Sequence, residues 1–133
     1  MKIVLDTNVL VSGIFWRGTP REILFFWVEG KFEIIASKSI LEEYRTVIHR
    51  IDPNSEVSDR WFIFILEKCY IVPNHQIKRI SRDSDDDKFI NCSIVGNADY
   101  LVSGDSDLTQ LSKSNDLPIT ILTPAEFLRR LKA

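Results

Sequence analysis

The chain has 133 residues, of which 44% are hydrophobic and 27% are charged, and its formal net charge is −2. This length accommodates one domain with its own core, and the composition excludes the disordered and fibrous classes of protein. The 17 basic residues do not outnumber the 19 acidic ones, which argues against nucleic-acid binding by bulk positive charge.

Five short runs rich in β-branched residues predict strands. In chain order they are Lys2–Leu5, Glu33–Ala36, Tyr70–Val72, Tyr100–Ser103 and Ile119–Leu122. The runs are apolar throughout rather than alternating, as expected of a parallel sheet that is covered on both faces.

Helices are predicted between and after these strands, over residues 20–29, 38–50, 57–68, 86–95 and 124–132, with loops at 53–55 and 73–86. Two helix starts carry strong signals. Thr19 and Thr123 each precede a proline and stand three residues before a glutamate, so both are expected N-caps. The alternation of strands and helices predicts one domain over residues 1–133, an α/β protein with a three-layer α/β/α sandwich. Its centre would be a mostly parallel five-stranded sheet with right-handed crossovers.

The sequence also predicts a location. No apolar stretch reaches the ~20 residues of a membrane-spanning helix, and the first residues show no secretory signal. We therefore expect a cytoplasmic protein without membrane contact, in which Cys69 and Cys92 are buried, reduced thiols. These cysteines and the distant His49 and His75 lack the spacing of zinc ligands.

Carboxylates stand where several predicted elements begin or end. Asp6 and Asp105 follow the first and fourth strands, Asp87 lies in the first turn of a helix, and Glu43 would project from a helix flank. Glu42 is about 100° away round that helix, so only one of the two glutamates should face the others. Ligands bind outside the carboxyl ends of parallel strands, where like charges repel unless a divalent cation joins them. The sequence therefore predicts a Mg²⁺ or Mn²⁺ site.

Each acid alone also has an ordinary structural interpretation. An Asp after a strand is usually a turn residue or an N-cap, and the run Asp83–Asp87 would be a solvated loop with a helix cap. We prefer Asp87 to Asp86 because Phe89, Ile90 and Ile94 define a buried face behind it, but the pattern leaves both open.

Four segments together resemble the PIN-domain nucleases, whose members include the VapC-like ribonuclease toxins of toxin–antitoxin systems. The segments are Leu5–Leu10, Ser39–Tyr44, Asp83–Phe89 and Ala98–Leu108. The similarity spans essentially the whole chain, with Ile121–Phe127 also fitting.

The resemblance implies the residues of the site. Its catalytic and metal-binding acids would be Asp6, Glu43, Asp87 and Asp105, with Asp107 as an accessory metal ligand and with Asn8 and Ser103 as polar supports. Oxygen ligands favour Mg²⁺ or Mn²⁺ over zinc without deciding between the two. The implied activity is hydrolysis of RNA phosphodiester bonds by a two-metal mechanism that leaves 5′-phosphate and 3′-hydroxyl ends.

The resemblance also implies partners, namely an RNA substrate, a protein antitoxin and a second copy of the chain in a homodimer. The candidates for holding RNA phosphates are Arg17, Lys38, Arg82 and Lys88, each otherwise a solvated surface charge. Phe15 and Trp16 are candidates for stacking on bases. Packing or a subunit interface is the more ordinary role for Trp16, Phe25, Phe26 and Trp27.

Other functions stay open at this point. A haloacid-dehalogenase-like phosphatase also has an Asp after its first strand, but it has a second aspartate two residues later, where this chain has Asn8. A receiver-like regulatory domain has a lysine after a late strand, which Ile119–Thr123 lacks. A non-catalytic interaction module would keep the fold alone, and the presence of all four acids argues against it.

Overall fold

A computed structural model describes residues 1–54, 56–74, 84–114 and 117–133, with residues 84–86 and 112–114 described by their backbone alone. The elements, in chain order, are β1 (Lys2–Leu5), α1 (Thr7–Phe15), α2 (Thr19–Val28), β2 (Glu33–Ser37), α3 (Lys38–Ile51), α4 (Glu56–Lys68), β3 (Tyr70–Val72), α5 (Ser84–Val95), β4 (Tyr100–Val102), α6 (Ser106–Ser114), β5 (Ile121–Leu122) and α7 (Pro124–Lys132).

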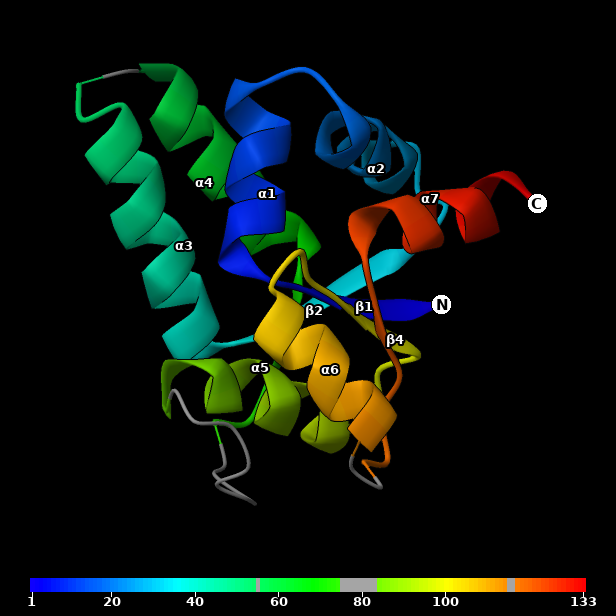
Figure 1. Cartoon of the computed structure of the whole chain (residues 1–133). Coiled ribbons are helices and arrows are strands. Elements are labelled where there is room, and N and C mark those ends of the chain that lie inside the picture. The colour runs from blue at the N-terminus through cyan, green and yellow to red at the C-terminus, as the bar shows by residue number, and fades with distance from the viewer. Residues whose placement is uncertain (55, 75–83, 115–116) are drawn as a thin grey trace.

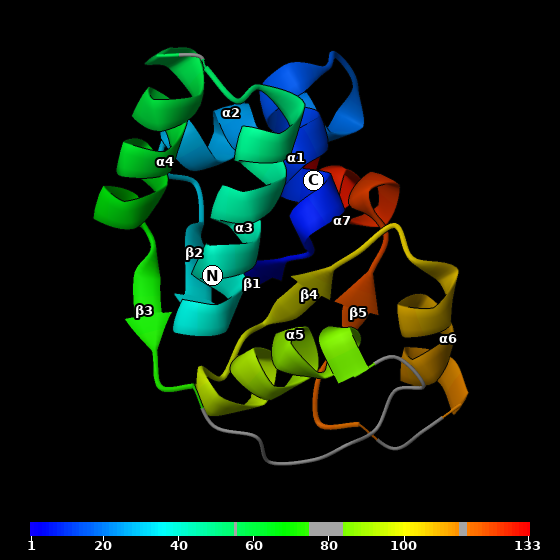
Figure 2. The same cartoon turned by 90° about the vertical axis from the view of Figure 1, so that its left-hand side faces the viewer.

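The five strands form one parallel sheet in the order β3-β2-β1-β4-β5. From β1 the chain moves outward to β2 and β3, and then it crosses back to β4 and β5 on the other side of β1. Because crossovers are right-handed, this reversal places the helices that connect β1, β2 and β3 on one face and those that connect β3, β4 and β5 on the other. Figures 1 and 2 show α5 and α6 on one side of the sheet and α1, α2, α3, α4 and α7 on the other. The predicted α/β/α sandwich is confirmed.

Two helices, α1 and α6, were not predicted from the pattern. Each begins directly after an acid that follows a strand, Asp6 and Asp105. In α1 most side chains are buried, including three consecutive apolar residues at 9–11, so a helical period is hard to see in its sequence. The strands agree closely with prediction, except that β2 ends at Ser37, β4 ends at Val102 and β5 begins at Ile121.

One predicted helix cap is wrong and the other is confirmed. Gly18, not Thr19, is the N-cap of α2, and it has no side-chain cap hydrogen bond. Its φ of 136° lies in a region that favours glycine, and it lets Thr19 join the first turn before Pro20. At α7, Thr123 and Glu126 form the expected capping box, with hydrogen bonds of 3.1 and 3.2 Å. Helix α5 begins at Ser84, two residues earlier than predicted, and most of the loop predicted at 73–86 lies outside the described residues.

The core lies on both faces of the central strands. Ile3, Val4 and Leu5 of β1 have no exposed surface, whereas Tyr70 and Ile71 of the edge strand β3 are exposed. Cys69 and Cys92 are buried and unpaired by any disulfide, as predicted. In the described part of the chain, no helix combines the length and apolar character needed to cross a bilayer.

Candidate metal centre

The sheet brings the ends of β1 and β4 together. These strands are neighbours with Leu5 opposite Val102, so the residues that follow, Asp6 and Ser103, leave the sheet side by side. The Asp6 amide donates to the Val102 carbonyl over 2.9 Å. The order of the strands reverses at this pair, and such a position leaves a crevice at the carboxyl edge of a parallel sheet.

Asp6 is almost completely buried at this edge, with 9% of its surface exposed. Its carboxylate caps α1 by accepting the backbone N–H of Asn8 over 3.3 Å. The other carboxylate oxygen accepts the Ser103 hydroxyl over 2.7 Å, and the same hydroxyl oxygen accepts the backbone N–H of Asp105 over 3.0 Å. Ser103 therefore links Asp6 to the loop that carries Asp105. The Asn8 bond to Asp6 comes from its backbone N–H.

Asp105 is half-buried and directly precedes α6. Its carboxylate accepts the backbone N–H of Asp107 over 2.9 Å, and its carbonyl accepts that of Thr109 over 3.1 Å. Asp107 is itself exposed. Asp6 and Asp105 thus both have the ordinary role of an N-cap, and these bonds hold their carboxylates at the same edge of the sheet.

Glu43 is placed by the residue that follows it. Tyr44 is fully buried, and its hydroxyl donates to the Leu5 carbonyl over 2.5 Å, which ties α3 to the end of β1. The Glu43 carboxylate accepts the Thr7 hydroxyl, and it pairs with the Lys88 ammonium over 2.5 Å. Glu42 is exposed, so Glu43 is the glutamate of this pair that faces the strand ends.

Asp87 lies in the first part of α5 and is 3% exposed. Asn91, one turn later, is buried as well. Because the neighbouring Lys88 reaches Glu43, the start of α5 lies against α3 at this edge of the sheet. The side chain of Asp86 is outside the described part of the chain.

Charge repulsion acts on Asp6. Burial raises the pKa of its carboxyl, and the negative charges of Asp105 and Glu43 raise it further. The hydrogen bonds from Ser103 and from the Asn8 amide oppose this shift. Asp105 and Glu43 are therefore each near enough to Asp6 for their charges to act on its carboxyl.

The donor set suits a hard divalent cation in type and charge, because it consists of carboxylate oxygens that repel one another. As the side chains stand, no three His, Cys, Asp or Glu residues of the described ranges lie close enough together to hold one ion. Glu43 is turned toward Thr7 and Lys88, and Asp6 is held by Ser103. A site with three carboxylate ligands would need a side-chain rearrangement.

The predicted RNA-binding cations differ in their surroundings. Arg17 and Lys38 are exposed, whereas Lys88 is largely buried in its ion pair with Glu43. Arg82 lies outside the described residues. Of the aromatic candidates, Trp27 is fully buried and serves packing, Phe15 and Phe26 are half-buried, and Trp16 and Phe25 are more than half exposed.

Sequence reasoning missed two residues that shape this site, Thr7 and Tyr44. Thr7 binds the Glu43 carboxylate, and Tyr44 fixes α3 on β1. Thr7 directly follows Asp6 and Tyr44 directly follows Glu43, and this adjacency is the sequence feature that could have identified them.

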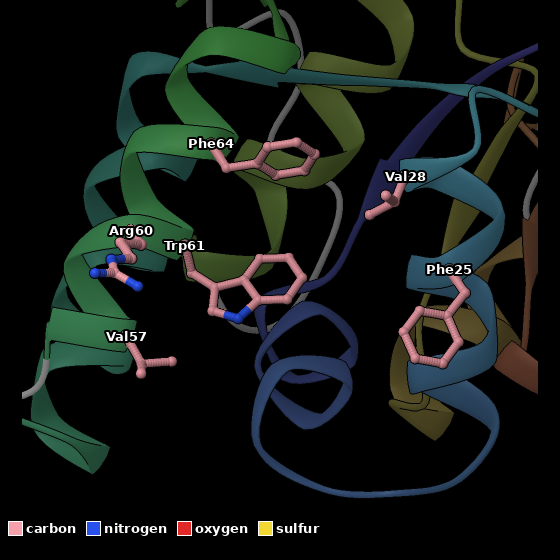
Figure 3. Close-up of a pocket in the computed structure, with 6 residues that line it drawn as sticks. All are labelled: Phe25, Val28, Val57, Arg60, Trp61 and Phe64. Atoms are coloured by element: carbon pink, nitrogen blue, oxygen red, sulfur yellow. The ribbon is translucent and has the colours of Figure 1, made fainter.

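A second surface lies between α2 and α4. It is an apolar groove of about 440 Å³, lined by Phe25 and Val28 of α2 and by Val57, Arg60, Trp61 and Phe64 of α4. Figure 3 shows Trp61 and Phe64 directed across the gap toward α2. Phe64 packs edge-on against the buried Trp27, with ring centres 5.1 Å apart.

The PIN domain family model matches residues 2–107 of the chain. Among solved structures, the fold is similar to that of VapBC2 from Rickettsia felis bound to a DNA fragment from its promoter. The TM-score is 0.63, with 16% identity over 92% of this chain and 98% of that chain. It is also similar to PAE2754 from Pyrobaculum aerophilum, with a TM-score of 0.65 and 12% identity over 99% of this chain and 90% of that chain. No curated protein matches the sequence.

Proposed function

The chain belongs to the PIN domain family, and we propose from this premise that it is a Mg²⁺- or Mn²⁺-dependent endoribonuclease that hydrolyses RNA phosphodiester bonds. The observation that carries the proposal is the meeting of Asp6, Asp105 and Glu43 where the strand order reverses. Because the chain belongs to this family, it is neither a haloacid-dehalogenase-like phosphatase nor a receiver-like domain. A non-catalytic module of the same fold is the alternative that experiments must exclude.

In this proposal Asp6, Glu43, Asp87 and Asp105 hold two ions, and Asp107 is an accessory ligand. Bound ions would neutralise charge on the phosphate and activate the attacking water. The Ser103 hydroxyl orients the Asp6 carboxylate through a 2.7 Å hydrogen bond. Residues that hydrogen-bond to a metal ligand commonly orient it in this way.

Glu43 would exchange its partner when it becomes a ligand. Its carboxylate is neutralised here by the Lys88 ammonium, so that no uncompensated charge is left in a largely buried place. We propose that Lys88 is released on metal binding and then holds an RNA phosphate, together with Arg17 and Lys38 from the surface.

We further propose that the chain is the toxin of a toxin–antitoxin pair. The similarity in fold to the VapBC2 structure supports this biological role. The antitoxin would dock on the α2–α4 groove through an apolar segment. Phe25, Val28 and Val57 each expose 45% or more of their surface, and a protein partner commonly covers such a patch. Among the described residues that line the groove, Arg60 is the one that carries a charge, and it already pairs with Glu56 of the same helix over 3.7 Å.

Cleavage of labelled single-stranded and structured RNA tests the nuclease. We expect the wild type to cleave with Mn²⁺ and to stop with EDTA, and Asp6→Asn and Asp105→Asn to lose roughly 100-fold or more of the rate. Asp99→Asn is the matched control. Asp99 is an exposed aspartate at the opposite edge of the sheet, where it accepts the Lys2 amide over 2.7 Å. Equal cleavage by wild type and Asp6→Asn would indicate a contaminant, and no cleavage by the wild type would favour the non-catalytic module.

Two variants of α4 test the groove. Val57 and Ile63 are each 54% exposed, but only Val57 lines the groove. Val57→Glu should abolish co-purification with the proposed antitoxin when the two proteins are produced together, whereas Ile63→Glu should retain it. Sedimentation of the chain alone tests the predicted homodimer. A dimer that Val57→Glu dissociates would assign the groove to a second copy instead of an antitoxin.

A further inference from the structure

A cleft of about 380 Å³ opens beside the candidate metal centre and continues along α1. Asp6 and Asp105 line one part of it. Asn8 and Ser12, one helical turn apart, line it from α1. Pro20 and Pro124, at the starts of α2 and α7, complete its walls. Val9 and Gly104 also line it. The proposed metal site accounts for the two acids, but not for the side chains of Asn8, Ser12, Pro20 and Pro124.

Two polar side chains of this cleft, those of Asn8 and Ser12, have donors and acceptors that are not used within the described part of the chain. Asn8 donates its backbone N–H to Asp6, and its exposed side-chain amide makes no hydrogen bond with any described residue. The Ser12 hydroxyl likewise has no partner among residues 1–54, 56–74, 84–114 and 117–133. An amide offers both donors and an acceptor, and a hydroxyl offers one of each. Both groups line the cleft and can bind a ligand without breaking an internal bond.

The proline walls are held in place by contacts behind them. At Gly13 a Cβ would lie 2.8 Å from the Pro20 carbonyl oxygen, so the glycine lets α1 and the start of α2 approach closely. Arg21 reinforces this corner by donating to the carbonyls of Gly13 and Ile14 over 3.2 and 2.9 Å. Pro124 is the first residue of α7, whose start is fixed by the capping box. The cleft is therefore preformed, which lowers the entropic cost of binding.

We propose that this cleft binds one unpaired nucleotide of the RNA strand, next to the phosphate that is cleaved. The rings of Pro20 and Pro124 would contact the faces of the base, and Asn8 and Ser12 would bind its polar edge or its ribose. A base can enter such a cleft only when it is unstacked and unpaired, which is how proteins usually read RNA in single strands and loops. The inference rests on the proposed nuclease function. In it, Asn8 and Ser12 of α1 select which nucleotide lies beside the scissile bond.

The proposed nucleotide site is tested by measuring RNA binding and RNA cleavage separately. Four fluorescein-labelled single-stranded hexanucleotides, differing in base composition, are titrated with protein in EDTA and in Ca²⁺, and binding is followed by anisotropy. Mapping of cleavage sites in a longer RNA with Mn²⁺ then reports the preferred neighbour. Asn8→Ala and Ser12→Ala should each weaken binding roughly five- to tenfold, as expected when one hydrogen bond to a ligand is lost. Both variants should also change the distribution of cleavage sites. Asn54→Ala, in the exposed turn after α3, is the matched control.

The outcomes are distinguishable. Binding that depends on Asn8 and Ser12 without cleavage by the wild type would keep the nucleotide site and reject the nuclease. Cleavage with an unchanged site pattern and affinities within twofold of the wild type in both variants would overturn the nucleotide site and keep the nuclease. An unaltered Mn²⁺-induced rise in melting temperature in both variants would show that any loss of binding does not come from a damaged metal centre.

Discussion

The replacement Asp6→Asn should have opposite effects on stability with and without divalent metal. Asp6 is buried, and Asp105 and Glu43 add their negative charges, so its pKa in the folded protein is above the ordinary value of 3.8. The folded state then binds this proton more tightly than the unfolded chain does. The contribution of Asp6 to stability is therefore present below pH 3.8 and is lost as the pH rises through the raised pKa of the folded state. Asparagine keeps the shape and removes the charge, so without metal at neutral pH the variant should be as stable as the wild type or more stable.

With saturating divalent metal, the wild type should instead be more stable than Asp6→Asn. A ligand at 100 times its dissociation constant stabilises the folded state by about 2.7 kcal/mol. For a chain of this length that corresponds to a rise in melting temperature of about 10 °C. The negative charges of Asp105 and Glu43 both act on the Asp6 carboxylate. Replacing Asp6 should therefore remove most of the metal-induced rise in melting temperature.

Thermal unfolding followed by circular dichroism, in EDTA and in saturating Mn²⁺ between pH 4 and pH 8, measures both effects. The control Asp99→Asn should keep the full metal-induced rise. An equal rise in wild type and Asp6→Asn would refute the assignment of Asp6 as a metal ligand. A variant that is much less stable than the wild type in EDTA at pH 7 would refute the argument from charge repulsion.

Three further predictions concern the scaffold. Tyr44→Phe removes the hydrogen bond to the Leu5 carbonyl and should lower the free energy of unfolding by about 1–2 kcal/mol, measured by urea titration. Gly13→Ala brings a Cβ within 2.8 Å of the Pro20 carbonyl oxygen and should cost about 1–3 kcal/mol in the same titration, whereas Gly104→Ala meets no atom within 4 Å and should cost less. Burial raises the pKa values of Cys69 and Cys92 to about 12, so iodoacetamide at pH 8 should modify neither thiol until urea unfolds the protein, and rapid labelling of the folded protein would contradict their burial.

The cap role of Asp6 and Asp105 has a consequence for function. A capping carboxylate is oriented by backbone N–H groups, as Asp6 is by Asn8 and Asp105 by Asp107. Because these bonds are local, they orient the two carboxylates without a bound ion, whereas Glu43 would have to leave Thr7 and Lys88 to become a third ligand. Their structural and proposed catalytic roles are therefore compatible, and neither interpretation of the sequence excludes the other.

Much of the fold could be predicted because its causes are local. Unbroken apolar runs such as Ile3–Leu5 predict buried parallel strands, and the Thr123-Pro124 signal predicts the start of α7. The local signal failed at Thr19, where the backbone freedom of Gly18 shifts the helix start by one residue. It also failed for α1, since a helix that is buried on nearly all sides shows little periodicity.

The sequence by itself determined the fold class, the acids that follow β1 and β4, and the resemblance to the PIN domain family. Only the tertiary structure decided that Glu43 and not Glu42 faces those acids, that its carboxylate is held by Thr7 and Lys88, and that a cleft with Asn8 and Ser12 adjoins the centre. The physical reason is that strand and helix propensities act over a few neighbouring residues. The Tyr44 hydroxyl that places Glu43 binds the Leu5 carbonyl 39 positions away, and such a contact exists only after the sheet and helices have packed.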